Sequence, residues 1–403
     1  LLGQHYAVTL PYTVVKVTDG YVVKNTAVQI VNNVRKKTNT VSNPLKPINP
    51  KKDVTVQVGG DSIDGKSVYL NHTFLYRLDS SILPPDRAYQ TVTDWGGTDQ
   101  LATEYDQYLG NWAVYASRDL YRDGQVLAAK GEKIAGSGFD SSKFGGNLFT
   151  VDADDNGKVT ADATQTYLDL VSADNEHEAG WVLYLQCKRI AVADEVPNTW
   201  TETINGQPRE SNKVVTKTPD MTPSIHLEKV DTPTLKQDGQ EQADRDDPKQ
   251  ALKMDADNIG ITFIITNTSK TDPATGDGTW YKASDLNLDD STIVGDAHVD
   301  MDSLTYPDNW DTLVLKPGES VSVTGTLKGV KEGDTHTDRA IVTGTPLVEC
   351  APSNGDPFND KTDGGEDTDP EYSTGDVTEI DGKQLCADTQ TTSNTDDWNG
   401  YRA

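Results

Sequence analysis

The residues with the clearest chemical potential are two lysines and an asparagine at opposite ends of one segment. Lys51 and Lys52 precede an alternating apolar run that starts at Val54, and Asn212 precedes a later run that starts at Val214. A buried lysine amine can attack the side-chain amide of an asparagine when a carboxylic acid lies close to both. The products are a side-chain amide (an isopeptide bond) and ammonia. These positions permit a covalent tie between the first and last strands of one domain if a buried acid lies between them, although lysine near a linker is usually a solvated charge.

This chemistry requires burial of all three groups. A solvent-exposed lysine is protonated, with a pKa near 10.4, and is not a nucleophile. Burial disfavours charge, so it lowers the pKa of a lysine and raises that of a carboxylic acid, by up to about 3–5 units. The neutral acid can then polarise the amide carbonyl and transfer protons. Such a reaction runs once, and it indicates a domain built to bear load and resist proteolysis.

Composition and charge argue against several classes of function. The chain has 64 acidic and 36 basic residues among 403, a formal net charge of -28 and a pI near 4.4. Such a surface repels phosphate backbones and anionic lipid, so we expect neither nucleic acid nor a membrane surface as a partner. No apolar run approaches the roughly 18 residues of a membrane span. Because the sequence lacks a leader and an initiator Met, we interpret it as an internal part of a larger protein.

Short runs rich in Val, Ile, Tyr and Thr predict strands almost throughout. They are separated by turn residues at short intervals, which is typical of β-sandwiches. The clearest runs cover residues 12–17, 53–58, 73–77, 112–116, 260–266 and 320–325. One helix is predicted over residues 162–171, where Ala, Tyr and Leu recur at helical spacing. The sequence therefore predicts an all-β chain of β-sandwich domains in tandem.

Two proline-bearing stretches, residues 43–50 and 216–223, predict domain boundaries, because proline cannot join a central β-ladder and suits semi-rigid linkers. They divide the chain into residues 1–45, 46–219 and 220–350, followed by an acidic tail over residues 351–403. The sequence around Asn39 before the first linker resembles that around Asn212 before the second. We therefore interpret residues 1–45 as the end of an upstream sandwich domain, with Asn39 as its crosslink residue.

The three cysteines have different expected roles. Cys187 lies in an apolar strand and is expected to be a buried thiol. Cys350 and Cys386 lie in the polar C-terminal part and could form one disulfide that tethers the tail. That bond would require an oxidising location.

Several collinear stretches resemble the C-terminal region of streptococcal antigen I/II-type surface adhesins, over residues of about 20–219. They are Ile48-Asn-Pro-Lys-Lys-Asp-Val54, Ile63-Asp-Gly-Lys66, Phe74-Leu-Tyr-Arg-Leu78, Ile82-Leu-Pro-Pro85, Tyr108-Leu-Gly-Asn-Trp-Ala-Val-Tyr-Ala116, Lys188-Arg-Ile-Ala-Val192, and Thr203-Ile-Asn-Gly206 running to Ser211-Asn212. The resemblance implies immunoglobulin-like β-sandwiches with an internal Lys–Asn isopeptide bond. It assigns Lys52 as the nucleophile, Asn212 as the acceptor and Asp99 as the acid, with Asp94 and Asp106 as alternatives.

The third domain offers a similar set of residues. Lys229 stands near its start, and Asp338 stands in a strand that resembles the final strand of repeated bacterial surface domains, which often have asparagine there. An aspartate can also form an isopeptide bond, with loss of water. We predict a possible Lys229–Asp338 crosslink assisted by Asp289, against the alternative of an uncrosslinked sandwich.

A metal site is indicated weakly by Asp152, Asp154 and Asn156, which imitate the start of a calcium loop. The twelfth position would be Ala163 instead of a bidentate glutamate, so a plain β-turn is the preferred interpretation. The adhesin resemblance still implies that structural calcium is plausible somewhere in the chain. No cofactor is required for the expected chemistry.

The leading functional hypothesis is an adhesive stalk segment of a Gram-positive cell-surface protein, monomeric and anchored to the wall through sequence outside this chain. The resemblance implies a host glycoprotein partner of the salivary scavenger-receptor type, or another surface ligand. The first alternative is a secreted carbohydrate-active enzyme that uses carboxylate pairs. Its candidate acids are Asp99, Asp106, Asp152 and Asp289. The second alternative is a pilus subunit, although no lysine-bearing pilin motif is found.

Overall fold

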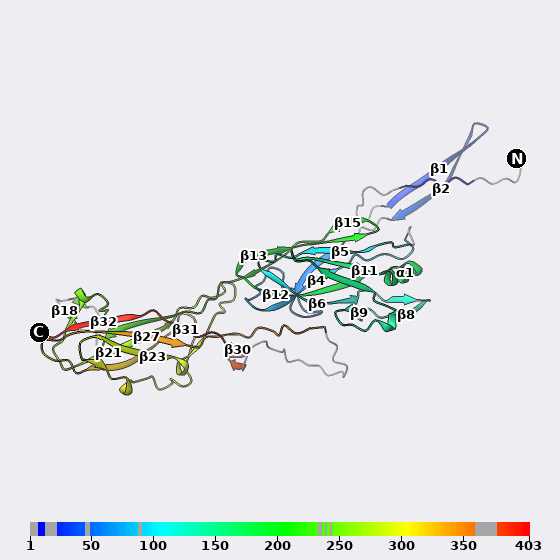
Figure 1. The fold of residues 1–403 in the computed structure, drawn as a ribbon. Coiled ribbons are helices and arrows are strands. Elements are labelled where there is room, and N and C mark those ends of the chain that lie inside the picture. Colours follow the sequence, from blue (N-terminus) through cyan, green and yellow to red (C-terminus); the bar gives the residue numbers. More distant parts are fainter. Residues whose placement is uncertain are drawn as a thin grey trace.

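The computed structural model describes residues 7–12, 22–44, 49–87, 91–232, 236–237, 240–241, 244–358 and 377–403. Figure 1 shows an N-terminal hairpin, a middle domain and a third domain arranged in a row, with the C-terminus at the far end of the third domain. Nearly all regular elements are strands, as the sequence predicts. Among the described residues, no helix has the length and apolar character needed to cross a membrane.

The N-terminal hairpin consists of β1 (Val22–Val31) and β2 (Val34–Pro44), paired antiparallel. Asn32 and Asn33 form its two-residue turn and both have positive φ, which asparagine tolerates better than most residues. The side chains described on both strands are exposed, including Asn39. The hairpin therefore has no core of its own among the described residues.

The middle domain contains two five-stranded sheets. The order of the first sheet is β10 (Phe149–Ala153), β11 (Lys158–Ala163), β5 (Trp95–Gln100), β14 (Trp200–Ile204) and β15 (Gln207–Glu210). The order of the second is β3 (Lys51–Thr55), β4 (Thr73–Asp79), β12 (Trp181–Arg189), β6 (Asp106–Ala116) and β9 (Lys133–Gly136). Two small pairs complete it: β13 (Ala193–Asn198) with β16 (Val214–Thr218), and β7 (Leu120–Arg122) with β8 (Gln125–Ala128).

The core of this domain lies between the two sheets and is rich in aromatic residues. The Trp181 ring lies 6.1 Å from that of Trp95, 5.8 Å from that of Trp200 and 5.3 Å from that of Phe149. Because these rings come from both sheets, their burial holds the sheets face to face. The single α-helix, α1 (Gln165–Ala173), follows β11 close to its predicted position and adds Tyr167 to the same core.

The third domain also has two facing sheets. One has the order β17 (Ile225–Asp231), β21 (Asn258–Asn267), β26 (Ser320–Lys328) and β24 (His298–Val299). The other has the order β20 (Leu252–Lys253), β32 (Asp396–Tyr401), β27 (Thr335–Gly344) and β23 (Asn287–Val294), with β31 (Thr391–Thr392) also paired to β27. A third, small sheet joins β28 (Leu347–Glu349), β30 (Lys383–Ala387) and β29 (Thr378–Ile380). The remaining pairs of this domain are β22 (Tyr281–Lys282) with β25 (Val314–Leu315) and β18 (Lys236–Gln237) with β19 (Gln240–Glu241). Short 3-10 turns begin at Pro248, Ala283 and Met301 in this domain and at Ser142 in the middle domain.

The predicted tail contributes to this sandwich. β32 lies between β20 and β27, so residues 396–401 are a central strand of the second sheet. Trp398 is fully buried in the core, and its Nε1 donates a 2.6 Å hydrogen bond to Asp231 of β17. The third domain therefore extends past residue 350, because one tryptophan anchors a segment whose average composition is polar.

Candidate functional site

The first candidate site is a buried ion pair between Lys52 of β3 and Asp99 of β5. The two side chains are 0% and 1% exposed, and Lys52 Nζ contacts Asp99 Oδ2. Nζ also lies 4.3 Å from the centroid of the Tyr76 ring. Burial lowers the pKa of Lys52, although the neighbouring Asp99 carboxylate acts in the opposite direction. The sequence-predicted nucleophile and acid are therefore in contact inside the sandwich.

Close strand packing positions Asp99. In the first sheet it lies opposite Val159 of β11 and Trp200 of β14. Gly97 faces the same way two residues earlier, and a Cβ added there would lie 2.5 Å from Thr201 O. Glycine at this position therefore lets β14 approach β5 closely and fixes the depth of Asp99.

A second buried ion pair occupies Asp106, which was an alternative acid. Asp106 Oδ1 accepts a 2.7 Å bond from Arg189 Nε, and its Oδ2 accepts a 2.7 Å bond from the Tyr76 hydroxyl. Arg189 also donates to the hydroxyls of Thr216 and Thr218, so β16 is tied to the same network. Asp106 is thus engaged by a permanent cation, and it orients the tyrosine beneath Lys52. The other alternative, Asp94, accepts a 3.1 Å bond from Gly206 N at a turn away from Lys52.

Asn212 lies beside Lys52 but contacts its main chain. Lys52 N donates to Asn212 Oδ1 at 2.9 Å, and Asn212 Nδ2 donates to Lys52 O at 2.9 Å. The carboxamide therefore makes the two main-chain hydrogen bonds at Lys52 that a paired neighbouring strand would make. In this arrangement both of its polar atoms are already used.

A different carboxamide, that of Asn198, was missed in the sequence. Asn198 ends β13 and is 6% exposed, and its Nδ2 has no hydrogen-bond partner among the described residues. It faces inward in phase with Trp200, which lies opposite Asp99 and donates from Nε1 to Lys51 O at 2.9 Å. Asn198 pairs with Val214 of β16 and stands two residues before Trp200, the β14 residue that pairs with Asp99. A polar residue in phase with buried Val196 and Trp200 was the signal available in the sequence.

The third domain has a second buried cluster around Lys229 of β17. Lys229 Nζ lies 2.5 Å from Asp290 Oδ2 and 2.5 Å from Asp338 Oδ1, and all three side chains are at most 1% exposed. His336 Nε2 lies 3.1 Å from Asp338 Oδ2. Burial raises the pKa of Asp290 to about 6, with Lys229 opposing and Asp338 reinforcing that shift. The structure thus brings the predicted Lys229 and Asp338 together.

The carboxylate of β23 that contacts Lys229 is that of Asp290 and not that of the predicted Asp289. Side chains alternate along β23, and Asp289 is exposed while Asp290 faces inward with Leu288. The sequence prediction was one residue out of phase. A one-residue shift moves a strand side chain to the opposite face of the sheet, so Asp289 cannot reach Lys229.

The remaining predicted site residues lie apart from these clusters. Asp154 Oδ1 accepts from Asn156 N and Lys158 N at 2.9 Å, so this carboxylate closes the turn between β10 and β11. Asp152 is exposed on β10. Across the described ranges, no group of three or more His, Cys, Asp or Glu side chains is arranged to hold a metal ion. The four acids proposed for an enzyme are also separated. Asp99 and Asp106 each pair with a buried cation, whereas Asp152 and Asp289 are exposed on strands of different domains.

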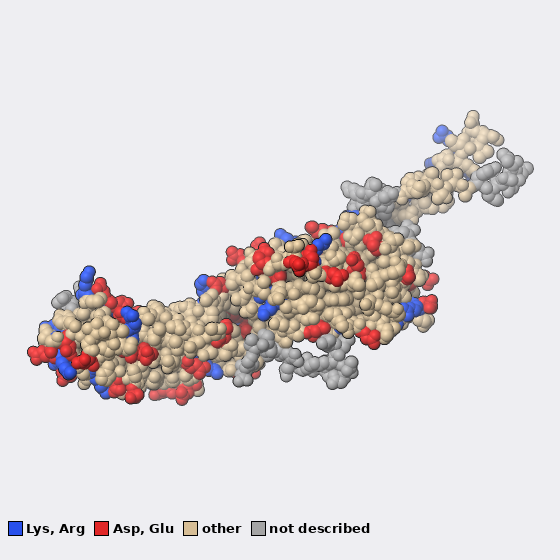
Figure 2. Space-filling view, viewed as in Figure 1, with Lys and Arg blue, Asp and Glu red and all other residues tan. Residues whose placement is uncertain are grey.

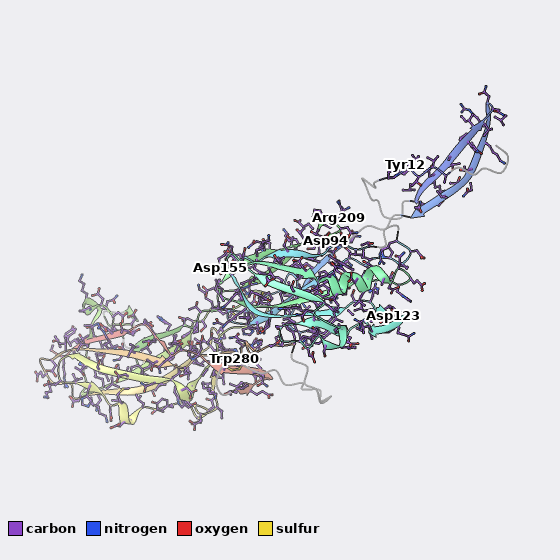
Figure 3. The ribbon with its side chains drawn as sticks, turned by 45° about the vertical axis from the view of Figure 1, so that its right-hand side comes forward. Tyr12, Asp94, Asp123, Asp155, Arg209 and Trp280 are labelled. Atoms are coloured by element: carbon purple, nitrogen blue, oxygen red, sulfur yellow. A yellow bond between two sulfur atoms is a disulfide. The ribbon has the colours of Figure 1, made fainter. Side chains whose placement is uncertain are left out.

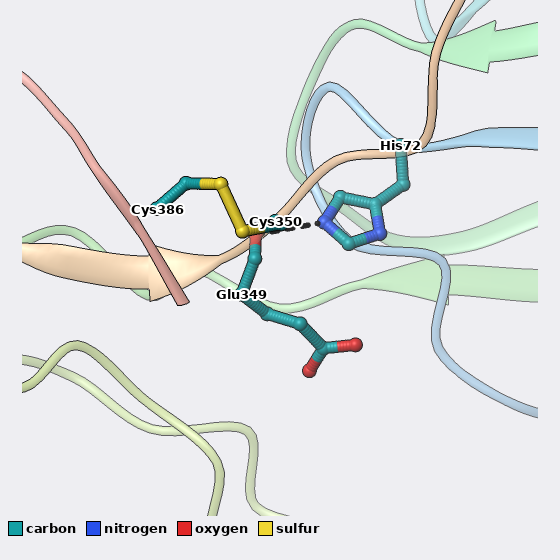
Figure 4. The surroundings of a disulfide bond; sticks show 4 residues. All are labelled: His72, Glu349, Cys350 and Cys386. Atoms are coloured by element: carbon teal, nitrogen blue, oxygen red, sulfur yellow. Dashed lines mark hydrogen bonds between the residues drawn. A yellow bond between two sulfur atoms is a disulfide. The ribbon is translucent and has the colours of Figure 1, made fainter. Parts of the chain in front are cut away.

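The cysteines are arranged as the sequence suggested. Cys187 is buried on β12. Cys350 and Cys386 form a disulfide beside β28 and β30, which Figure 4 shows next to His72 of the middle domain. Acidic side chains are spread over the visible face of both domains with basic ones scattered among them, in keeping with the net charge (Figure 2).

Comparisons with known proteins follow the domain pattern. Residues 49–219 match a family described as cell surface antigen C-terminus, and residues 1–45 match one described as cell surface antigen I/II C2 terminal domain. The aggregation substance of Enterococcus faecalis is 36% identical over 221 residues, which are 54% of this chain and 16% of that protein. The proteins that this chain resembles are thus cell-surface antigens and an aggregation substance.

Two solved structures are similar over about half of the chain. The C-terminal domain of the Streptococcus pyogenes antigen I/II-family protein AspA is 28% identical, covers 49% of this chain and 54% of that chain, and has a TM-score of 0.43. The C-terminal domain of the Streptococcus agalactiae polypeptide BspA is 24% identical, covers 49% of this chain and 59% of that chain, and has a TM-score of 0.42. The chain thus spans just over half of these two structures.

Proposed function

From the match of residues 1–45 and 49–219 to antigen I/II C-terminal domains, we propose that this chain is a load-bearing stalk segment of a bacterial surface adhesin. Its sandwich domains are immunoglobulin-like units in tandem, and they hold a distal binding region away from the cell wall. Anchoring to the wall involves parts of the protein outside residues 1–403, and this segment itself contributes to binding of a host glycoprotein. The observation that carries the proposal is the Lys52–Asp99 pair, sealed in a core where a simple ion pair gains little stability.

The pair is suited to one self-catalysed reaction. Transfer of a proton from Lys52 Nζ to Asp99 leaves a neutral amine and a neutral acid. The amine attacks Cγ of Asn198, an Nζ–Cγ bond forms and the Cγ–Nδ2 bond breaks. Asp99 gives its proton to the departing Nδ2 nitrogen and then takes the second proton from Nζ, so ammonia leaves and Asp99 ends as the neutral acid. The unpartnered Nδ2 of Asn198 favours this residue over the sequence-predicted Asn212, whose carboxamide bonds the β3 main chain.

The crosslink would stabilise the domain mainly through its unfolded state. It joins β3 to β13, near the two ends of the middle domain. By the loop-entropy model used for disulfides, closing a loop of this order contributes about 4–5 kcal/mol. An amide cannot be reduced, so this contribution persists under conditions that open disulfides.

Intact-mass spectrometry of the purified chain tests the proposal. Beyond the two hydrogens lost to the Cys350–Cys386 disulfide, we expect the middle domain to lower the mass by one ammonia, and peptide mapping should recover a branched peptide joining Lys52 to Asn198. In Asn198→Ala and Asp99→Ala the loss of ammonia should disappear from the intact mass. In Asp94→Ala the loss of one ammonia should remain. A branched peptide at Asn212 would reassign the acceptor, and an uncrosslinked Lys52 would overturn the crosslink itself.

In the third domain we propose an amide between Lys229 and Asp338, with Asp290 as the acid. Here the Nζ–Cγ bond forms as a carboxyl C–O bond breaks, and water leaves. The contacts of Lys229 with both carboxylates and the raised pKa of Asp290 support this assignment. The same mass measurement reads it out, because the loss of water differs from the loss of ammonia. Structural calcium and a host glycoprotein partner of the scavenger-receptor type also stay proposals, and calorimetric titration with each ligand tests them.

A further inference from the structure

The outer face of the second sheet of the middle domain is unusually buried. An antiparallel sheet at a protein surface normally has one apolar and one solvated face. In β12, however, consecutive side chains from Trp181 to Cys187 are buried, so both faces of this strand are covered. Core residues such as Leu183 account for the inner face. Something else must therefore cover the outer face.

The cover is a segment of the third domain. Phe358 is 2% exposed and packs with four buried residues of the outer face, with Val58 and Tyr115 at the edge. The four residues are Leu75 of β4, Ala113 of β6, and Val182 and Tyr184 of β12. We call this site the Phe358 socket, and residues 351–358 the strap.

Polar contacts fix the main chain of the strap along the same sheet. Lys133 Nζ donates to Phe358 O at 2.5 Å, and Gln186 Nε2 donates to Gly355 O at 3.1 Å. Asn111 Nδ2 donates to Gln186 Oε1 at 2.8 Å and so orients that amide. The strap therefore follows specific middle-domain partners as well as an apolar surface.

The strap starts at the disulfide. Cys350 bonds to Cys386 of β30, and Cys350 N donates to Gln384 O at 3.0 Å, so the base of the strap is tied to the small sheet of the third domain. Figure 4 shows His72 of the middle domain reaching this point, with His72 Nε2 3.3 Å from Glu349 O. Trp280 packs against Leu347 and Leu385 of the same small sheet and lies at the joint between the domains in Figure 3.

A second contact lies at the same joint. Tyr69 donates to Asp277 Oδ2 at 2.9 Å, and Ser67 donates to Asp272 Oδ2 at 2.7 Å. Asp277 also binds Lys383 of β30. The small sheet thus holds the middle domain at two separated points, one through this loop and one through the strap.

We propose that the strap is an interdomain latch: the disulfide anchors it to the third domain, and Phe358 engages the socket on the middle domain. The latch converts the proline-bearing linker between β16 and β17 from a hinge into a rigid joint. It acts between domains, whereas the proposed amides act within them. It therefore does not depend on crosslink formation.

Hydrogen–deuterium exchange and small-angle X-ray scattering of the full chain test the latch. In Phe358→Ala we expect amides of residues 350–358 to exchange at least about tenfold faster, because truncation of a buried phenylalanine removes more than the free energy for that factor. The scattering should show a broader distribution of interdomain distances. Tyr306→Ala, which truncates an exposed aromatic residue of the third domain, is the matched control and should change neither measurement.

Two further variants keep the test decisive. Lys133→Met retains the apolar stem but loses the bond to Phe358 O, and it should increase strap exchange to a smaller extent. Cys350→Ser combined with Cys386→Ser should release the base of the strap while exchange in the β3 and β5 core stays unchanged. Unchanged strap exchange and unchanged scattering in Phe358→Ala would overturn the latch. Unchanged strap exchange in the double serine variant would overturn the anchoring role of the disulfide.

Discussion

The carboxamide of Asn212 binds both main-chain groups of Lys52: Oδ1 accepts from Lys52 N at 2.9 Å, and Nδ2 donates to Lys52 O at 2.9 Å. The third domain repeats this arrangement: Asn394 Oδ1 accepts from Leu227 N at 2.8 Å, and Asn394 Nδ2 donates to Leu227 O at 2.9 Å. In each case the asparagine precedes a late strand and supports the first strand of its domain. The repeated geometry indicates a structural role for Asn212 that is separate from the chemistry of the Lys52 amine.

Replacing Asn212 with alanine should therefore destabilise the middle domain without removing its crosslink. Two hydrogen bonds to the β3 main chain are lost, and each contributes about 0.5–1.5 kcal/mol. We expect a drop of about 1–3 kcal/mol in the free energy of unfolding, measured by chemical denaturation. The intact mass should still lack one ammonia. Loss of the crosslink in Asn212→Ala, with the domain folded, would contradict this division of roles.

The neighbours Asp289 and Asp290 provide a matched pair in the third domain. Asp290→Asn removes the buried acid next to Lys229, so we expect the loss of one water to disappear from the intact mass. Asp289→Asn makes the same chemical change one residue earlier on the exposed face of β23, and the crosslink should form normally. Equal effects of the two substitutions on the intact mass would show that crosslink formation does not depend on the buried position of Asp290.

Two arginine–aspartate pairs allow the stability contribution of a buried ion pair to be compared with that of an exposed one. Arg189→Met leaves Asp106 buried without its cation, and loss of one partner of a buried pair costs about 3–5 kcal/mol. Arg339→Met breaks the pair with Asp397, in which the arginine side chain is 47% exposed, and such pairs contribute about 0–1 kcal/mol. Thermal unfolding of both variants measures the difference. Similar small losses would mean that water reaches Asp106 when Arg189 is absent.

The sequence was sufficient for most of the elements. Alternating apolar runs predicted an all-β chain, and the resemblance to surface adhesins selected Lys52 and Asp99, which the structure places in contact. What the sequence analysis left unused was the alternation of side chains between the two faces of a strand. Neither Asp290 nor the buried Asn198 was selected from the sequence, although each is in phase with buried neighbours. In both cases the two-residue period of the strand carried more information than distance along the chain.

The C-terminal segment was harder to predict, because composition averages over residues with opposite roles. Residues 351–403 are acidic and polar as a whole, yet Trp398 and Phe358 each enter an apolar site. Only the contacts with β27 and with the outer face of β12 reveal which isolated aromatic residues matter. Those contacts are long-range, so no local pattern encodes them.

The buried Asp396 of β32 should make the third domain more stable in mild acid. Burial and the nearby carboxylates of Asp246, Glu228 and Asp244 raise the pKa of Asp396 to about 8. In the unfolded chain the pKa of an aspartate is about 3.9, so the folded state binds more protons between about pH 4 and pH 8. Stability therefore falls as the pH rises through this window.

Calorimetry of the third-domain transition at pH 5 and pH 8 checks this sign. We expect a midpoint higher at pH 5 by at least about 2–4 °C, the shift that about 1 kcal/mol produces in a domain of this size. Asp396→Asn should raise the midpoint at pH 8 and flatten the dependence, because no charge forms at the buried site. Asp397→Asn is the control: the pKa of Asp397 is lowered by Arg339, so it stays charged from pH 5 to pH 8 and its loss leaves the slope unchanged. A midpoint that rises from pH 5 to pH 8 in the unmodified chain would show that Asp396 is charged when folded, and that a cation or water compensates it.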